Sequence, residues 1–136
     1  MVATHLGALH FYQLALPVPK AKAGSFDATA AGRGQSTFNG KGRCATCHVP
    51  PLFAEPGWNV HKPSEIGIDD FQANRSPDKS YRTAPLRGLM THAKGDFYHD
   101  GRFADLAAVV DHYSQFMKLA LSDAEKRDLM EYLKSL

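Results

Sequence analysis

Apolar residues recur at steps of three and four positions towards the end of the chain. They do so between residues 103 and 117, and again between residues 129 and 136. Because an α-helix turns once every 3.6 residues, this spacing places the apolar side chains on one face of each helix. Ser122 and Glu125 have the spacing of a capping box, which marks a helix start. The pattern therefore predicts that this part of the chain is helical.

An earlier helix is expected just before the two cysteines of the chain. Ser25 or Asp27 is placed to cap its first turn. The helix should run to about Phe38, with Gly40 and Gly42 ending it.

Two other segments are expected to be irregular. Residues 1–24 hold an apolar stretch followed by closely spaced prolines, which favour an extended strap or linker. Residues 49–80 carry five prolines and two glycines and should be mostly loop. A loop of this length is unusual in a compact domain, and a large cofactor that supplies part of the core is a natural reason for one. We therefore divide the chain into a strap, residues 1–24, and one domain, residues 25–136.

Composition narrows the class of protein. The chain has 136 residues, of which 43% are apolar and 22% charged, as in one soluble globular domain. The formal charge of +2 leans towards acidic partners, and no run of lysines or arginines argues for nucleic acid. No apolar stretch approaches the roughly 18–20 residues needed to cross a bilayer.

The two cysteines carry the chemistry. With the histidine that follows them they form the pattern C-x-x-C-H at Cys44, Cys47 and His48. This pattern is the attachment signature of haem c. Two thiols on one helical turn can each add to a haem vinyl group, and the histidine then lies under the iron as an axial ligand. Its other ring nitrogen is expected to donate to a nearby carbonyl, which fixes the tautomer.

Other interpretations of the cysteine pair fit the sequence less well. A redox-active C-x-x-C pair is expected near a βαβ pattern, which is not evident. A zinc site needs four ligands, and only scattered histidines are available beside Cys47 and His48. A disulfide across two residues closes too small a loop to add much stability. The sequence therefore predicts a small all-α, cytochrome c-like domain with long loops wrapping one covalently bound haem c.

The start of the sequence bears on where such a haem is attached. Bacteria normally attach haem c outside the cytoplasm, yet residues 1–20 lack the positive n-region and the A-x-A cleavage site of a signal peptide. Either a starting methionine has replaced the leader, or the sequence is a segment of a longer exported protein. We favour the second explanation and expect a periplasmic or otherwise exported protein.

Several segments together resemble one family. They are residues 33–48, which end in the C-x-x-C-H pattern, residues 81–89 (YRTAPLRGL), residues 97–101 (FYHDG) and residues 106–113 (LAAVVDHY). In combination they resemble the C-terminal haem domain of the di-haem cytochrome c peroxidase/MauG superfamily. The similarity spans roughly residues 25–136.

The chain also departs from that family. Enzymes of the superfamily carry two haems, whereas this chain has a single C-x-x-C-H pattern. The leading functional prediction is therefore a mono-haem electron carrier that docks an acidic-surfaced redox partner protein. The alternative is the C-terminal haem portion of a larger peroxidase-like or MauG-like di-haem oxidoreductase. No acid–base pair beside an open iron is evident in the sequence, so no catalytic residue is assigned.

The sequence leaves the identity of the ligand on the second face of the iron undecided. The resemblance implies a methionine, or a tyrosine in MauG-like members, on the helix after the Y-H-D-G turn, and the matching residue is Tyr113. Met117 lies one turn further on the same face and has a soft thioether. Met90, His92 and His61 are further candidates, and an iron with an open position is the remaining alternative.

Buried haem propionates need charged or hydrogen-bonding partners. Arg82 and Arg87 are candidates for that role, with simple solvent exposure as the alternative. The resemblance implies that His99 helps to organise the haem pocket, near a propionate, while its alternative is a structural histidine at a turn. Trp58 is expected to pack against the haem.

Overall fold

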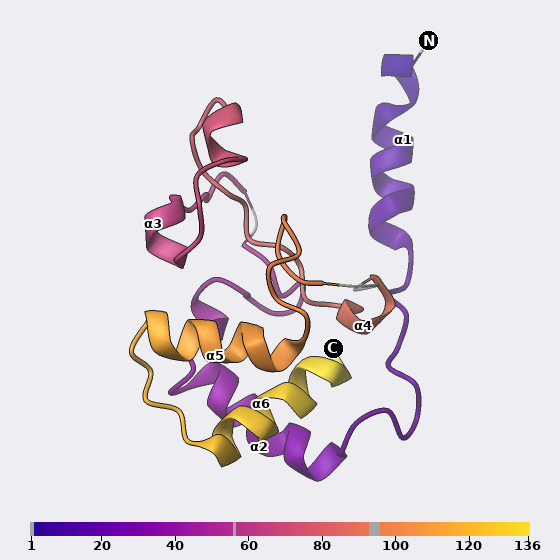
Figure 1. Ribbon diagram of the computed structural model, residues 1–136. Coiled ribbons are helices and arrows are strands. Elements are labelled where there is room, and N and C mark those ends of the chain that lie inside the picture. Colours follow the sequence, from indigo (N-terminus) through magenta and orange to yellow (C-terminus); the bar gives the residue numbers. More distant parts are fainter. Residues whose placement is uncertain (1, 56, 93–95) are drawn as a thin grey trace.

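The computed structural model describes residues 2–55, 57–92 and 96–136, leaving aside the side chains of residues 2, 3 and 92. Its architecture is helical, as predicted (Figure 1). Within these residues the only β-type pairings are two isolated bridges, His61 with Tyr81 and Phe97 with Phe103. None of the described helices is long and apolar enough to cross a membrane.

Three helices form the packed part of the fold: α2 (Ala28–Asn39), α5 (Leu106–Phe116) and α6 (Asp123–Ser135). Helix α6 packs against both α2 and α5 (Figure 1). At Gly34 the backbones of α2 and α6 come so close that a Cβ there would lie 2.0 Å from the Asp128 carbonyl oxygen. The core side chains are Ala31, Phe38, Leu89, Leu106, Val110, Leu121, Leu129, Tyr132 and Leu133.

The ends of these helices follow the local sequence. Asp27, one of the two predicted caps, accepts hydrogen bonds from the backbone N–H groups of Thr29 and Ala30 at the start of α2. The predicted capping box of α6 is confirmed: Glu125 N–H donates to Ser122 Oγ at 3.2 Å, and Ser122 N–H donates back to Glu125 Oε2 at 2.7 Å. Each helix start therefore has side-chain partners for its free N–H groups.

The segment between the cysteines and α5 is mostly loop, as its prolines indicate. Its described residues, which exclude 56 and 93–95, contain only short helical pieces: α3 (Pro63–Ile66), η2 (Ala73–Arg75) and α4 (Leu89–His92). The Gly88 N–H, just before α4, donates to the Leu136 carbonyl at 2.8 Å and ties the end of this loop to the last residue of the chain. That these loops wrap a haem stays a prediction.

The expectation of an extended strap over residues 1–24 is wrong for its first part. Residues Val2–Ala15 form helix α1, and the irregular chain begins only after it. The physical reason is local, because the prolines lie at positions 17 and 19 and restrict only the residues next to them. Helix α1 stands apart from the other helices in Figure 1, and its apolar side chains, such as Phe11, are exposed.

Candidate functional site

The C-x-x-C-H motif lies on a single turn at the end of α2. Residues Cys44–Thr46 form the 3₁₀ turn η1, and the His48 N–H donates to the Cys44 carbonyl at 2.9 Å. The turn follows a tight reversal at Gly42, where a Cβ would lie 2.8 Å from the Thr37 carbonyl oxygen. Glycine at this position lets the chain leave α2 and fold back at once. Both thiols and the imidazole are thereby placed on one turn, as haem attachment requires.

His48 is held in one orientation by a loop carbonyl. Its Nδ1 atom lies 3.1 Å from the Phe53 carbonyl oxygen. Because a carbonyl only accepts, Nδ1 must carry the proton and donate, so the lone pair is on Nε2, the nitrogen that could bind a metal. Burial lowers the pKa of His48, so the imidazole is neutral at physiological pH. The predicted hydrogen bond to a nearby carbonyl is thus present.

Both cysteines are free and partly buried. Burial raises the pKa of the Cys44 thiol to about 11, so this thiol is protonated at neutral pH. Activated redox cysteines instead have a lowered pKa and an electropositive setting. The Cys44 environment therefore does not resemble that of a redox-active pair.

Tyr113 lies on α5, far from the motif in sequence. Its pKa is raised chiefly by burial and also by the Cys47 and Cys44 side chains, while the Tyr98 hydroxyl acts in the opposite direction. The Tyr113 phenol therefore lies within electrostatic reach of both thiols. Helix α5 thus brings a candidate second ligand into the neighbourhood of Cys44 and Cys47.

The other candidate ligands lie at the end of α5, on α4 and in the loop after the motif. Met117 ends α5 and is half-buried, while Met90 is half exposed on α4. His61 lies near Cys47, but its Nε2 is hydrogen-bonded to the Glu55 carboxylate. The side chain of His92 lies outside the described residues. Among the described candidates, Tyr113 has an oxygen that could bind a metal, lies within electrostatic reach of the motif and forms no described ion pair.

Sequence reasoning missed the polar cluster beside Cys47. Glu55 accepts hydrogen bonds from His61 and, at 2.9 Å, from Thr83 Oγ1. Burial alone would raise the pKa of Glu55, but these two hydrogen bonds lower it overall, so the carboxylate stays ionised. Glu55 sits in a proline-rich loop without periodic pattern, so no sequence signal pointed to it.

The predicted propionate partners lie on the loops. Arg82 donates from Nη1 to the Gly57 carbonyl at 2.9 Å, and Arg87 donates from Nη1 to the Pro51 carbonyl at 3.2 Å. Both arginines are exposed. Their pairing with propionates stays a prediction. Trp58 is 92% exposed, and its packing against a haem stays a prediction.

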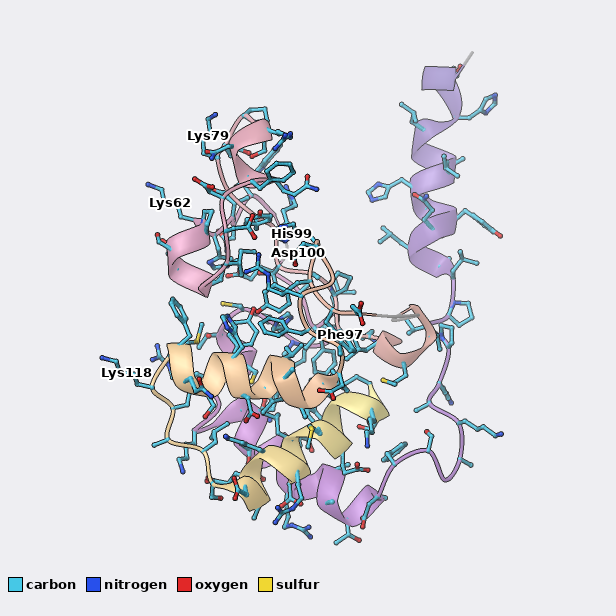
Figure 2. All side chains as sticks on the ribbon, in the orientation of Figure 1. Lys62, Lys79, Phe97, His99, Asp100 and Lys118 are labelled. Atoms are coloured by element: carbon cyan, nitrogen blue, oxygen red, sulfur yellow. The ribbon has the colours of Figure 1, made fainter. Side chains whose placement is uncertain are left out.

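His99 belongs to a separate charged cluster on the Y-H-D-G turn. Its Nε2 lies 3.3 Å from Asp69 Oδ2, and its ring lies 5.3 Å from that of Tyr81. Arg102 pairs with both Asp69 and Asp100, which neutralises the carboxylates around the histidine. Figure 2 shows His99 and Asp100 farther from α5 than Phe97 of the same turn. That His99 helps to organise a haem pocket, near a propionate, stays a prediction.

Comparisons with known proteins bear on the family. No family model matches the chain. It is 29% identical over 122 residues to the methylamine utilization protein MauG of Methylorubrum extorquens, covering 78% of this chain and 34% of that protein. It also resembles the crystal structure of a MauG-like protein associated with microbial copper homeostasis, with a TM-score of 0.61, 23% identity, and coverage of 85% of this chain and 49% of that one.

The chain thus spans about a third of the length of MauG and half of the length of the solved structure. At 23% identity the structural match shows the fold alone. The sequence match to MauG supports the resemblance to the di-haem cytochrome c peroxidase/MauG superfamily that the motifs indicate, and the structural match supports a shared fold.

Proposed function

We propose that residues 25–136 form a c-type cytochrome domain that holds one haem and transfers single electrons. The observation that carries this proposal is the His48 side chain, whose Nδ1 is held by the Phe53 carbonyl while Nε2 is left for a metal. Cys44 and Cys47, one turn away, supply the two thiols that thioether attachment needs. This donor set is complete for covalent attachment and for the first axial ligand.

The residues of the site fit a haem in four roles. Cys44 and Cys47 would hold it covalently, His48 would bind one face of the iron, and Tyr113 the other. When bound, haem c supplies one-electron chemistry whose potential depends on the axial ligands, and a tyrosine ligand lowers it relative to methionine. The buried Oη of Tyr98, next to Tyr113, has no hydrogen-bond partner among the described residues, which fits a site that a bound group would complete.

The two candidate ligands favour electron transfer over catalysis at the iron. If His48 and Tyr113 both bound the iron of a haem, no position would be left for peroxide or another small ligand. The surface supports docking of an acidic-surfaced redox partner protein, because the net charge is +2 and lysines such as Lys62, Lys79 and Lys118 extend outward (Figure 2). We place the protein in the periplasm or another exported compartment, where haem c is attached.

One experiment tests this function. The haem-loaded protein is examined by absorption spectroscopy in both oxidation states, with and without carbon monoxide. A low-spin spectrum that carbon monoxide leaves unchanged is the expected result, since both axial positions are filled. A high-spin spectrum, or one altered by carbon monoxide, contradicts the electron-carrier proposal and points to an open iron.

A second candidate function has a specific observation in its favour. Because the chain spans only 34% of MauG and 49% of the solved MauG-like chain, it fits the haem portion of a larger, peroxidase-like di-haem oxidoreductase. The haem content of the natural polypeptide separates the two candidates. One haem on a polypeptide of about this mass supports the carrier, whereas two haems on a longer polypeptide support the oxidoreductase.

A further inference from the structure

A buried hydroxyl beside Tyr113 has no partner of its own. The Oη atom of Tyr98 is buried and makes no hydrogen bond within the described part of the chain. Buried polar groups in proteins are nearly always hydrogen-bonded, so an unpaired one needs an explanation. The ring of Tyr113 lies next to it, with a centroid distance of 6.2 Å and a tilt of 36°.

The fold holds Tyr98 in this place against a local backbone preference. Its φ of 73° is in the left-handed region, which residues other than glycine rarely adopt. The bridge between Phe97 and Phe103 closes the turn, and the Tyr98 ring packs edge-on against Phe103 at 4.8 Å and His112 at 5.8 Å. Strained residues of this kind persist where the surroundings fix them, and they cluster at functional sites.

The chemistry of a bound phenolate decides the direction of a hydrogen bond between the two phenols. A tyrosine that binds a metal through its oxygen has given up its proton and can only accept. The Tyr98 hydroxyl, buried and next to the Tyr113 ring, keeps a proton that it can donate. Of this pair, Tyr98 is therefore the candidate donor.

We propose that Tyr98 is a positioning residue for the axial ligand, whose hydroxyl donates a hydrogen bond to the Tyr113 oxygen that serves as that ligand. The inference rests on the proposed function, with Tyr113 as the second ligand. A carboxylate or phenolate that accepts a hydrogen bond is a weaker electron donor, because the proton withdraws charge from its oxygen. The Tyr98 hydroxyl therefore raises the haem potential above the value that Tyr113 alone would set.

The test compares three haem-loaded proteins: the unaltered chain, Tyr98→Phe and Tyr132→Phe. The control also loses one hydroxyl from a core aromatic ring, but the Tyr132 hydroxyl interacts with Gln35 of α2 rather than with Tyr113. We measure the midpoint potential and the tyrosinate-to-iron charge-transfer band of each. Tyr98→Phe should change the redox equilibrium constant about tenfold in favour of the oxidised form, which lowers a one-electron potential by about 59 mV.

The charge-transfer band should move to longer wavelength in Tyr98→Phe, because a phenolate without the hydrogen bond is a stronger donor. Tyr132→Phe should match the unaltered protein in both readouts. An unchanged potential and band in Tyr98→Phe, with the tyrosinate band present, overturns this inference alone. Absence of a tyrosinate band from the unaltered protein overturns the inference together with the Tyr113 assignment, while a failure to attach haem overturns the proposed function itself.

A second measurement needs no variant and guards against a Tyr98→Phe protein that fails to fold. In heavy water the Tyr98 hydroxyl exchanges its proton for deuterium. The iron–tyrosinate stretch in the resonance Raman spectrum of the unaltered protein should then shift. No shift after complete exchange overturns the inference.

Discussion

The Nδ1 atom of His48 lies 3.1 Å from the carbonyl oxygen of Phe53, five residues further along the chain. The Phe53 ring in turn packs edge-on against Phe38 of α2 at 5.9 Å and Tyr132 of α6 at 6.5 Å. The orientation of the imidazole is therefore linked to the helical core through one loop residue. This link explains how a loop without regular structure can hold a metal ligand in a fixed tautomer.

Replacing Phe53 by alanine should weaken this link. The change removes a partly buried ring from the contact with Phe38 and Tyr132, and we expect the free energy of unfolding to fall by about 2–3 kcal/mol. Phe71→Ala is the matched control, because that ring is 60% exposed and contacts only Arg75 among the ring contacts described. The control should change stability by less than about 1 kcal/mol. Denaturant unfolding measures the unfolding free energy of both variants. Equal losses would contradict the packing of the Phe53 ring against the helical core.

The close approach of α2 and α6 gives a second prediction. In Gly34→Ala the new Cβ would meet the Asp128 backbone, so the helices must separate, and we expect a loss of at least about 1–3 kcal/mol. Gly32→Ala on the same helix meets nothing within 4 Å and should instead stabilise the protein by roughly 0.5–1 kcal/mol. The two denaturation midpoints should move in opposite directions. A stabilised Gly34→Ala variant would show that the two backbones are farther apart.

Acid should destabilise the protein in part by protonating Glu125 in the capping box of α6. Lys41 and the Ser122 backbone hold the pKa of Glu125 down at about 2, below the value of a carboxyl in the unfolded chain. The unfolded chain therefore binds more protons in this range, and the stabilising contribution is lost as the pH falls from about 4.5 towards 2. Glu125→Gln keeps a hydrogen-bonding side chain but removes the titration. Its unfolding free energy should depend less on pH in this window, and an unchanged dependence would refute the assignment.

Much of the fold could be predicted because the deciding interactions are local. Capping of α6 by Ser122 and Glu125, the start of α2 at Asp27 and the turn at Cys44 all depend on residues close together in the sequence. The apolar spacing of α5 and α6 is likewise a local signal. The error at α1 arose because the effect of the prolines was extended too far towards the N-terminus.

The rest of the site depends on contacts between distant segments. Glu55 meets Thr83 across 28 positions, and Asp69 meets Arg102 across 33. Neither contact follows a helical or strand period, so no pattern in the sequence could indicate it. Tyr113 was a candidate ligand through the family resemblance alone, because its position within electrostatic reach of the two cysteines depends on how α5 packs.

The second axial ligand can be identified with two variants of the haem-loaded protein. Tyr113→Phe should leave the iron with an open position, so that the spectrum becomes high-spin and responds to carbon monoxide. Met117→Leu, a change of similar volume one turn away, should keep the low-spin spectrum. The absorption spectra of both variants decide the assignment. The reverse outcome would identify Met117 as the ligand.

Covalent attachment of haem at Cys44 and Cys47 can be tested on the purified protein by an extraction assay. The protein is produced together with haem-attachment machinery, extracted with acid–acetone, and assayed as its pyridine haemochrome. We predict that haem resists extraction, gives a c-type haemochrome, and amounts to about one per chain, as a single C-x-x-C-H pattern requires. A well-folded, colourless protein that keeps both thiols free would contradict the account.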